Sequence, residues 1–521
     1  MTFLKKRNAF MLLSVLVVLA GCEKQLSENS ATVTQDYSLE SRKIENYHYE
    51  GKLYALTKDQ YIIEYDANYL NREVFTAAIH GLQTGEEILA IDMRPATGQL
   101  YGVSNQSRLY LIHPANGKAV AISMTPFTPA ISGTMVGFDF NPTVDRIRMV
   151  TSMDQNLRLH PETGAIVATD GNLNSAGAGI SSVAYTNSFA GAATTILYDI
   201  SNTDDMLYRQ IPPNDGKLVP VGKLGINVEG ESGFDISSDN SFALAVFSQS
   251  SGYGVKKRFY SIDLNTGQTK IVGNSRRNII GIALATTPVA YAVDVNNNLL
   301  VFNPFKKGDV TQKAITGLVM GEQILGIDIR PATGQLYALV NTSKLYTINT
   351  ISGAATLISA TPFATPLSGS SFGFDFNPTV DRIRVISNTG QNLRLHPVTG
   401  VIAAVDPALN PGSPVVDAAA YTNSYAGAIT TILYDIDIQT DKMFKQDPAN
   451  AGTLVPVGGL GIKASASNGF DIGSISNKGY GIFKSYDKTY LLEFNLNVGY
   501  AQRIIRDLNY DVRGFTIGLG L

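Results

Sequence analysis

The stretch Gly137–Arg148 reads G-F-D-F-N-P-T-V-D-R-I-R, and the same letters return at Gly373–Arg384. Two further matches share the same spacing of 236 residues: R-P-A-T-G-Q-L-Y at Arg94 and Arg330, and Q-N-L-R-L-H-P at Gln155 and Gln391. A constant spacing over matches this far apart means that one long unit has been duplicated. The sequence therefore predicts two halves with the same fold.

A shorter repeat lies inside each half. Corresponding apolar runs of the first half contain these positions, 47, 45, 51 and 48 residues apart: Asp92, Asp139, Ala184, Asp235 and Ala283. This spacing is typical of the four-stranded blades of a β-propeller. The runs are short and rich in β-branched and aromatic residues, and turns such as Pro161-Glu162-Thr163-Gly164 separate them. We therefore predict an all-β fold of the β-propeller type, with five blades per half.

The first repeat, Lys52 to Ala78, supplies outer strands but has no inner strand before it. A strand from further along the chain must complete it, because an unpaired sheet edge invites aggregation. Ile279 to Leu284 would close the first half into a five-bladed ring, whereas Gly514 to Leu521 would close all ten blades into one ring. We favour two tandem five-bladed propellers, at residues 47–286 and 287–521, with one ten-bladed ring as the alternative.

The amino terminus has the features of an export signal. Three basic residues precede an apolar run, Ala9 to Ala20, that is too short to span a bilayer. The run ends in Leu19-Ala20-Gly21-Cys22, which resembles the bacterial lipobox, and Cys22 is the only cysteine in the chain. We expect a signal peptide at residues 1–21, lipidation (palmitate) of Cys22, and a polar flexible tether over 22–46. Glu23 after the cysteine favours the outer membrane.

Composition restricts the partners. The net charge is only −3, with 44% hydrophobic and 16% charged residues, which is typical of a globular protein. Proteins that bind nucleic acid usually concentrate Lys and Arg on one face. We therefore expect no nucleic-acid partner, and a membrane contact only through the amino-terminal lipid.

The motifs F-N-P-T-V-D-R-I-R and Q-N-L-R-L-H-P resemble a bacterial family known only as a domain of unknown function, the DUF4394 family. The resemblance covers both halves and nearly the whole mature chain. It implies a propeller-like fold and secretion. It implies no activity, and no residue of this chain takes a role from it.

Three residue types in the repeated motifs are candidates for ligand binding. A short hairpin turn at Thr143 and Val144 would place Asp139 opposite Arg148, and the second half repeats the pair as Asp375 and Arg384. We interpret each pair first as a structural ion pair and second as a polar lining of the central channel. Y-T-N-S at Tyr185 and at Tyr421 is either packing within a blade or, if exposed, a grip for a carbohydrate or peptide.

Other motifs carry a simpler explanation. His113, His160 and His396 lie at strand or turn ends, and the counterpart of His113 is Asn349, so hydrogen bonding to the turn explains them without zinc. The acidic stretches Asp294–Asn298 and Asp435–Asp441 are similar to calcium loops, but turns between strands are also rich in Asp and Asn. Gly369–Gly373 matches a nucleophile elbow in letters, yet it runs into a predicted strand instead of a helix.

No catalytic set emerges from these residues, so we expect no cofactor, with calcium as the one cation to consider. The leading hypothesis is an envelope-anchored binding or scaffolding lipoprotein, with a protein or glycan partner, located at the outer membrane and facing the periplasm or the cell surface. The alternative is a calcium-dependent, lactonase-like hydrolase with its site in the channel. Asp92, Asp139 and Asp235 would supply the ligands if their blades bring them together.

Overall fold

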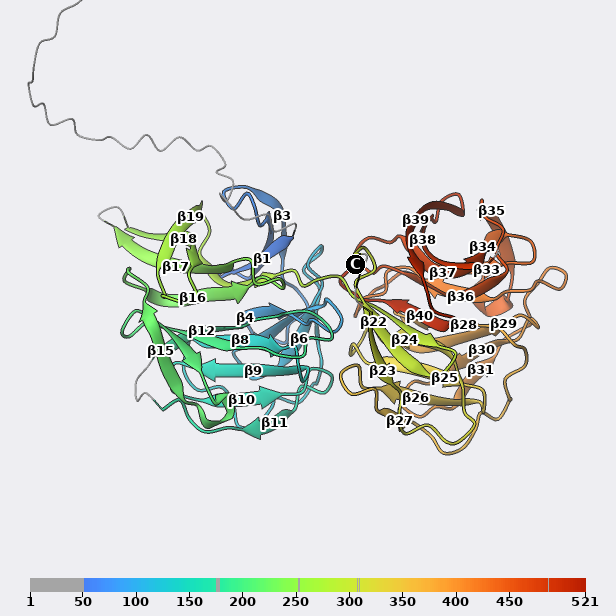
Figure 1. The fold of residues 1–521 in the computed structure, drawn as a ribbon, viewed down its shortest axis with the longest axis horizontal. Helices are drawn as coiled ribbons and strands as arrows, with labels where there is room; N and C mark the ends of the chain where they lie inside the picture. Colours follow the sequence, from blue (N-terminus) through green and yellow to red (C-terminus); the bar gives the residue numbers. More distant parts are fainter. Residues whose placement is uncertain (1–50, 175–178, 252–253, 307, 309, 486) are drawn as a thin grey trace, which may run out of the picture. The chain divides into compact units, whose positions relative to one another are not determined.

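The computed structural model describes residues 51–521, apart from 175–178, 252–253, 307, 309 and 486. The predicted signal peptide, Cys22 and the whole predicted tether lie outside the described residues. Within the described part the chain is all-β: ten antiparallel sheets of four strands each, joined by turns and two short 3-10 helices, Pro213–Asp215 and Ala449–Ala451 (Figure 1). None of the helices described there is long and apolar enough to cross a membrane.

The first half contains sheets 1 to 5. Sheet 1 is β20 (Ile279–Leu284), β1 (Lys52–Thr57), β2 (Tyr61–Asp66) and β3 (Glu73–Ala78). Sheet 2 is β4 (Ile88–Met93), β5 (Leu100–Ser104), β6 (Leu109–Ile112) and β7 (Ala119–Ala121). Sheet 3 is β8 (Val136–Asn141), β9 (Arg146–Thr151), β10 (Asn156–Leu159) and β11 (Ile166–Thr169). Sheet 4 is β12 (Ile180–Tyr185), β13 (Leu197–Ser201), β14 (Met206–Gln210) and β15 (Leu218–Lys223), and sheet 5 is β16 (Glu229–Ile236), β17 (Ala243–Ser251), β18 (Gly254–Ile262) and β19 (Thr269–Ser275).

The second half repeats this order as sheets 6 to 10. Sheet 6 is β40 (Val512–Ile517), β21 (Ala290–Asp294), β22 (Asn298–Phe302) and β23 (Val310–Ala314). Sheet 7 is β24 (Ile324–Ile329), β25 (Leu336–Val340), β26 (Lys344–Ile348) and β27 (Ala355–Leu357). Sheet 8 is β28 (Phe372–Asn377), β29 (Arg382–Ser387), β30 (Asn392–Leu395) and β31 (Ile402–Val405). Sheet 9 is β32 (Ala418–Tyr421), β33 (Leu433–Asp437), β34 (Lys442–Gln446) and β35 (Leu454–Gly459), and sheet 10 is β36 (Ala466–Ile472), β37 (Gly479–Ser485), β38 (Lys488–Asn495) and β39 (Tyr500–Leu508).

Each half is completed by a strand of its own. In sheet 1, β20 pairs antiparallel with β1, so that Leu53 lies opposite Leu284. In sheet 6, β40 pairs in the same way with β21, so that Ala290 lies opposite Ile517. Of the two closing strands that the sequence offered for the first repeat, the structure uses Ile279–Leu284.

The first strand of each sheet is its inner strand. In the first half the inner strands contact one another in the order β4, β8, β12, β16 and β20, and β20 contacts β4 again. The second half has the same cycle through β24, β28, β32, β36 and β40. Strands that follow one another in such a cycle pack closely, and glycine makes room for this. A Cβ on Gly233 would lie 2.6 Å from the backbone nitrogen of Ile282 in the next inner strand.

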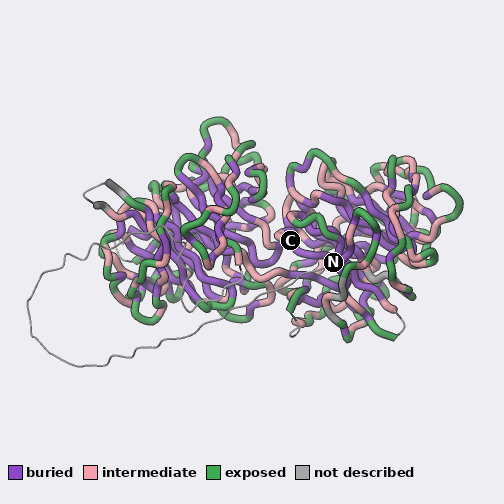
Figure 2. The backbone as a smooth tube through the Cα atoms, turned by 90° about the horizontal axis from the view of Figure 1, so that it is seen from above, coloured by how far each residue is buried: buried purple, intermediate pink, exposed green. Residues whose placement is uncertain are grey.

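Apolar side chains fill the spaces between neighbouring sheets. One cluster joins sheets 2 and 3 through residues such as Val103, Phe138 and Phe140, and another joins sheets 4 and 5 through Ile200, Phe234 and Phe247. Figure 2 shows buried residues gathered in the interior and exposed residues concentrated in the outer loops. Inner strands are buried on both faces, which explains why G-F-D-F-N reads as a nearly continuous apolar run.

We predict that residues 47–286 expressed alone fold cooperatively, because β20 supplies the fourth strand of sheet 1 within this half. Circular dichroism should show β structure and a single thermal transition. The matched control is residues 47–278, which lacks β20 and should aggregate or melt without a transition. A fragment 47–286 that behaves like the control would show that the first half depends on the second for its closure.

Candidate functional site

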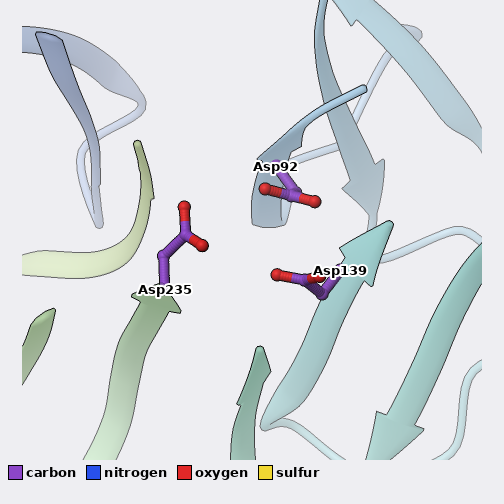
Figure 3. A group of neighbouring side chains, drawn as sticks. All are labelled: Asp92, Asp139 and Asp235. Atoms are coloured by element: carbon purple, nitrogen blue, oxygen red, sulfur yellow. The ribbon is translucent and has the colours of Figure 1, made fainter. Parts of the chain in front are cut away.

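Three inner strands of the first half each bring an aspartate to one place. Asp92, Asp139 and Asp235 lie on β4, β8 and β16, and their side chains point toward one another (Figure 3). One carboxylate oxygen from each lies within 4.8 Å of the others, and all three residues are buried. The other two inner strands have Ala184 and Ala283 at the corresponding positions. We call this group the first triad.

The first triad also ties neighbouring sheets together. Each carboxylate accepts a hydrogen bond from a backbone N–H of the next inner strand: Asp92 from Phe140 at 2.8 Å, Asp139 from Tyr185 at 3.1 Å and Asp235 from Leu284 at 2.6 Å. Hydrogen bonds to a charged acceptor are stronger than neutral ones. The aspartates therefore link sheet 2 to sheet 3, sheet 3 to sheet 4, and sheet 5 to the closing strand of sheet 1.

The second half has an equivalent group, the second triad, formed by Asp328, Asp375 and Asp471 with the same convergence within 4.8 Å. It differs at the fifth inner strand, where Thr516 stands in place of Ala283. The Oγ1 atom of Thr516 lies 2.7 Å from Oδ2 of Asp471 and 3.0 Å from Oδ1 of Asp328. A hydroxyl has one hydrogen to donate, so both contacts are hydrogen bonds only when one of the two carboxyls is protonated.

Burial and mutual repulsion control the ionisation of both triads. Burial raises the pKa of Asp139 well above its usual range, and the charges of Asp92 and Asp235 raise it further. Burial likewise raises the pKa of Asp235 to about 7 and that of Asp471 to about 6, although backbone N–H groups lower each. A carboxylate in low dielectric is costly unless a proton or an opposite charge compensates it. Each triad thus has an affinity for protons or for a cation.

The residues of the triads fit a hard divalent cation in donor type. Calcium prefers carboxylate oxygens and takes six to eight oxygen ligands, and each triad supplies three carboxylates from three different strands. At least one oxygen of each aspartate already accepts a backbone N–H in the first triad. Calcium would therefore share these oxygens with the links between sheets.

The predicted register of the repeated hairpin is confirmed, but the predicted ion pair is wrong. Asp139 lies opposite Arg148, and Asp375 opposite Arg384. Neither arginine binds the aspartate opposite it, because a tyrosine of the next inner strand contacts both residues. In the first half, the backbone N–H of Tyr185 donates to Asp139 and the Tyr185 phenol accepts from Arg148. In the second half, Tyr421 makes the same contacts with Asp375 and Arg384. The sequence predicts which residues lie opposite each other within one sheet, but it does not predict which residues of the neighbouring sheet they contact.

Each arginine is buried and instead binds a cluster of polar side chains that extends from the interior to the surface between two sheets. The Nη1 atom of Arg148 donates to Asp170 and to Asn156, both at 2.6 Å, and Nη2 donates to Asn214 at 2.8 Å. Arg384 has the corresponding partners Asp406, Asn392 and Asn450 in the second half. All six ligand-binding candidates are buried, with at most 2% of each exposed: Asp139, Arg148, Tyr185, Asp375, Arg384 and Tyr421. They do not form a surface for a large ligand, and the packing interpretation of the two tyrosines is confirmed.

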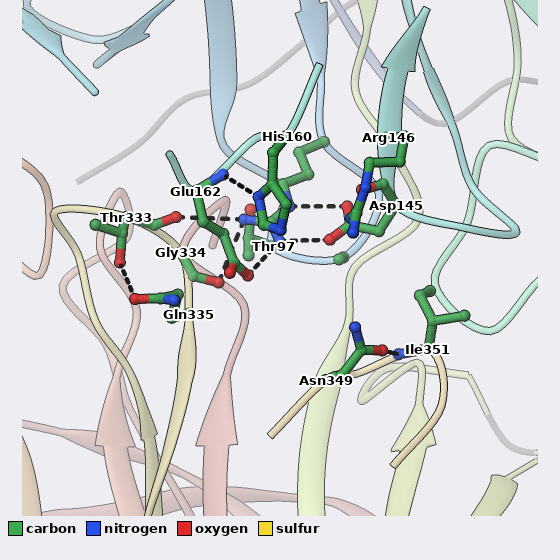
Figure 4. Close-up of polar contacts among 12 residues, drawn as sticks. Thr97, Asp145, Arg146, His160, Glu162, Thr333, Gly334, Gln335, Asn349 and Ile351 are labelled. Carbon is green, nitrogen blue, oxygen red and sulfur yellow. Dashed lines mark hydrogen bonds and ion pairs between the residues drawn. The ribbon is translucent and has the colours of Figure 1, made fainter. Parts of the chain in front are cut away.

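The turn interpretation holds for most of the remaining motifs. The Nδ1 atom of His160 accepts from the backbone N–H of Glu162, and Oδ1 of Asn349 accepts from that of Ile351 (Figure 4). Asp294 likewise accepts two backbone N–H groups of its own turn, from Asn296 and Asn298. The half-buried His113 has its pKa lowered to about 4 by burial, although the side chain of Asn116 in the same turn favours its charged form.

The sequence contained one signal that would have located the triads. Aspartate recurs at the same place in three of the five runs of each half, although inner strands are otherwise apolar. A charge repeated at one register position of a buried strand must have a partner in space. The sequence did not show that the inner strands form a closed cycle, and only this closure brings the three positions together.

The triads make folding depend on pH. Because their folded-state pKa values are raised, their contribution to stability is full below about pH 4, the usual pKa of an unfolded aspartate. The contribution of Asp235 is lost as the pH rises through about 7, and that of Asp471 as it rises through about 6. Asp139→Asn keeps the oxygen that accepts from Tyr185 and cannot ionise, so in the presence of a chelator it should raise the free energy of unfolding at pH 7, where the unfolded aspartate is charged.

Urea denaturation at pH 4 and pH 7 checks this expectation, with Asp375→Asn as the counterpart in the second triad and the exposed Asp263→Asn as control. The gain should be present at pH 7 and small at pH 4. Equal effects at both pH values would contradict a titrating triad.

The arginine cluster generates a second prediction. Arg148→Met should lower the free energy of unfolding by about 3–5 kcal/mol, because it leaves the carboxylate of Asp170, whose side chain is 6% exposed, without its buried partner. Arg158 binds the same carboxylate but is 31% exposed, so Arg158→Met should cost about 1 kcal/mol or less. Thermal or urea unfolding of both variants makes the comparison, and equal losses would show that burial does not decide the contribution.

Three solved structures each share 11% sequence identity with this chain. The extracellular domain of the one component system BT4673 from B. thetaiotaomicron has a TM-score of 0.24, with 90% of this chain and 67% of that chain covered. PorZ of the type-IX secretion system of Porphyromonas gingivalis has a TM-score of 0.26, with 89% and 58% covered, and the dihydro-heme d1 dehydrogenase NirN has a TM-score of 0.23, with 80% and 75% covered. At these TM-scores the similarities carry no argument about this chain. No curated protein matches it.

One known protein family matches most of the chain. The profile described as "Domain of unknown function (DUF4394)" matches residues 61–283 and again residues 298–516. The two matches fall in the two halves of the duplication and together include more than half of the sequence, so the chain belongs to the DUF4394 family and carries two tandem copies of its domain.

Proposed function

We propose that this chain is an envelope-anchored lipoprotein with a binding or scaffolding role, built from two tandem five-bladed β-propellers. The closing pairs β20 with β1 and β40 with β21 support two rings of five sheets over one ring of ten. The separate cycles of inner-strand contacts support the same arrangement. Rigid rings of this kind present loops at their rims, where binding residues are commonly located.

One observation carries the binding role: the two halves keep the same interior and differ at exposed loops. The buried motif Gly137–Arg148 is repeated without change. In contrast, Ile429, with 88% of its surface exposed, corresponds to Ala193, and Met153, 66% exposed, corresponds to Thr389. Duplicated interiors maintain the fold, whereas loops that differ by exposed apolar residues give each half its own contact surface.

The binding role predicts that a change at such a loop weakens capture of an envelope partner. Immobilised mature chain should enrich a protein or glycan from envelope extracts, and Ile429→Ser should reduce the recovery several-fold without changing the melting temperature. Ala193→Ser is the matched control at the equivalent loop of the first half. Recovery of no partner by the unaltered chain would count against a binding role.

The anchor rests on the Leu19-Ala20-Gly21-Cys22 motif. Cys22→Ser removes the thiol that carries the lipid, so the protein should leave the membrane fraction and no longer incorporate labelled palmitate. Separation of inner and outer membranes on a density gradient then tests the expected outer-membrane location. Unchanged membrane association of Cys22→Ser would refute the anchor and leave the propeller fold unaffected.

A second candidate, a calcium-dependent hydrolase with its site in the channel, is favoured by the convergence of Asp92, Asp139 and Asp235. Calcium at the triads would stabilise the folded protein, because the ion replaces the protons that burial otherwise demands. The melting temperature should then rise with added calcium, and less so for Asp139→Asn. Activity on a lactone that is lost with calcium on chelation would select this candidate, whereas no shift and no bound calcium would eliminate it.

A further inference from the structure

In the part of the chain that the structure describes, two aspartates between the sheets have no hydrogen-bond partner. Asp199 on β13 and Asp435 on β33 occupy equivalent positions in the two halves, and each is 0% exposed. Neither oxygen of either carboxylate has a hydrogen-bond partner among the described residues. Leaving a buried acceptor unsatisfied costs about 1–3 kcal/mol, and more for a charged group. The same arrangement occurs in both halves, so it is a property of the repeated unit.

A third acceptor faces the same space. Gln210 is 1% exposed, and its Oε1 atom also has no hydrogen-bond partner in the described part of the chain, while its Nε2 atom donates to the Pro213 carbonyl. In sheet 4, Asp199 lies opposite Tyr208, which is two residues before Gln210 on β14. Side chains two residues apart on a strand share one face, so both acceptors lie on the face of sheet 4 that bears Tyr208. Gln446 repeats this in the second half with its Oε1.

Among the described residues, Arg148 keeps one N–H without a partner beside Asp199. A guanidinium has five N–H groups, and Arg148 uses four, toward Tyr185, Asn156, Asp170 and Asn214. One N–H on Nη2 is left. Arg384 makes the same four bonds in the second half and has the same N–H left. Arg148 interacts electrostatically with Asp199, and Arg384 with Asp435, without a direct hydrogen bond.

The charges around Asp199 and Arg148 favour a neutral ligand. Arg148 and Arg158 both bind Asp170, which leaves one positive charge for Asp199 to balance. Burial raises the pKa of Asp199 well above its usual range, and Arg148 opposes that rise. When Asp199 is ionised its oxygens need donors, and when it is protonated its O–H needs an acceptor. A molecule that both donates and accepts satisfies either state.

We propose that each half encloses one ordered water molecule between its third and fourth sheets, namely between sheets 3 and 4 and between sheets 8 and 9. In the first half the water accepts the remaining N–H of Arg148 and donates to Asp199 and Gln210. In the second half it has the same three contacts with Arg384, Asp435 and Gln446. Buried waters typically make about three hydrogen bonds to buried polar groups that otherwise lack partners. This inference does not depend on the proposed function.

A crystal structure of the mature chain at high resolution tests the proposal directly. The expected result is one isolated density peak in each half, about 2.6–3.2 Å from the three polar groups. A peak with six or more oxygen neighbours at about 2.3–2.6 Å would identify calcium instead and overturn the proposal. Direct hydrogen bonds from Arg148 to Asp199, with no peak between them, would overturn it as well.

A measurement in solution gives an independent test. Oxygen-17 relaxation dispersion counts long-lived internal waters, and Asp199→Leu should remove one of them, because leucine fills the space and offers no acceptor. Asp435→Leu is the matched variant and should remove the other, and the double variant should remove two. Gln210→Met is the substitute if Asp199→Leu does not fold. Unchanged counts in folded variants would refute the enclosed water.

Discussion

The pairing of β20 with β1, and of β40 with β21, is the constraint on which the rest of the structure depends. Each pair joins strands from opposite ends of one half, and without it β1 or β21 would expose an unpaired row of backbone N–H and C=O groups. Because both closing strands come from their own half, the cycle of inner strands closes within five sheets. Closure also determines which inner-strand side chains meet.

The triads follow from that closure. Three inner strands place a carboxylate at the same register position, and a closed cycle brings these carboxylates within 4.8 Å. Burial raises the pKa values of Asp139 and Asp235, and the charges of Asp92 and Asp235 raise that of Asp139 further. The hydrogen bonds from the next inner strand offset part of this rise. The same side chains thus hold neighbouring sheets together and create a place where protons or a cation are favoured.

Comparison of the two halves separates what the fold requires from what it tolerates. The aspartates and the arginine clusters are repeated in full, while the fifth inner strand carries Ala283 in one half and Thr516 in the other. Thr516 adds a hydroxyl within reach of two carboxyls and so supplies the second triad with a partner that the first lacks. The two triads are therefore expected to differ in their affinity for a cation, although their strands are equivalent.

The sequence by itself determined the duplication, the four-stranded repeat, the turns and the opposition of Asp139 and Arg148, because these depend on spacing and on local backbone geometry. Only the tertiary structure decided that Ile279–Leu284 closes the first half and that Arg148 binds Asp170. It also showed that Asp92, Asp139 and Asp235 converge. The physical reason is that contacts between sheets join residues from separate repeats, and the periodicity within a strand carries no information about which sheet packs against which.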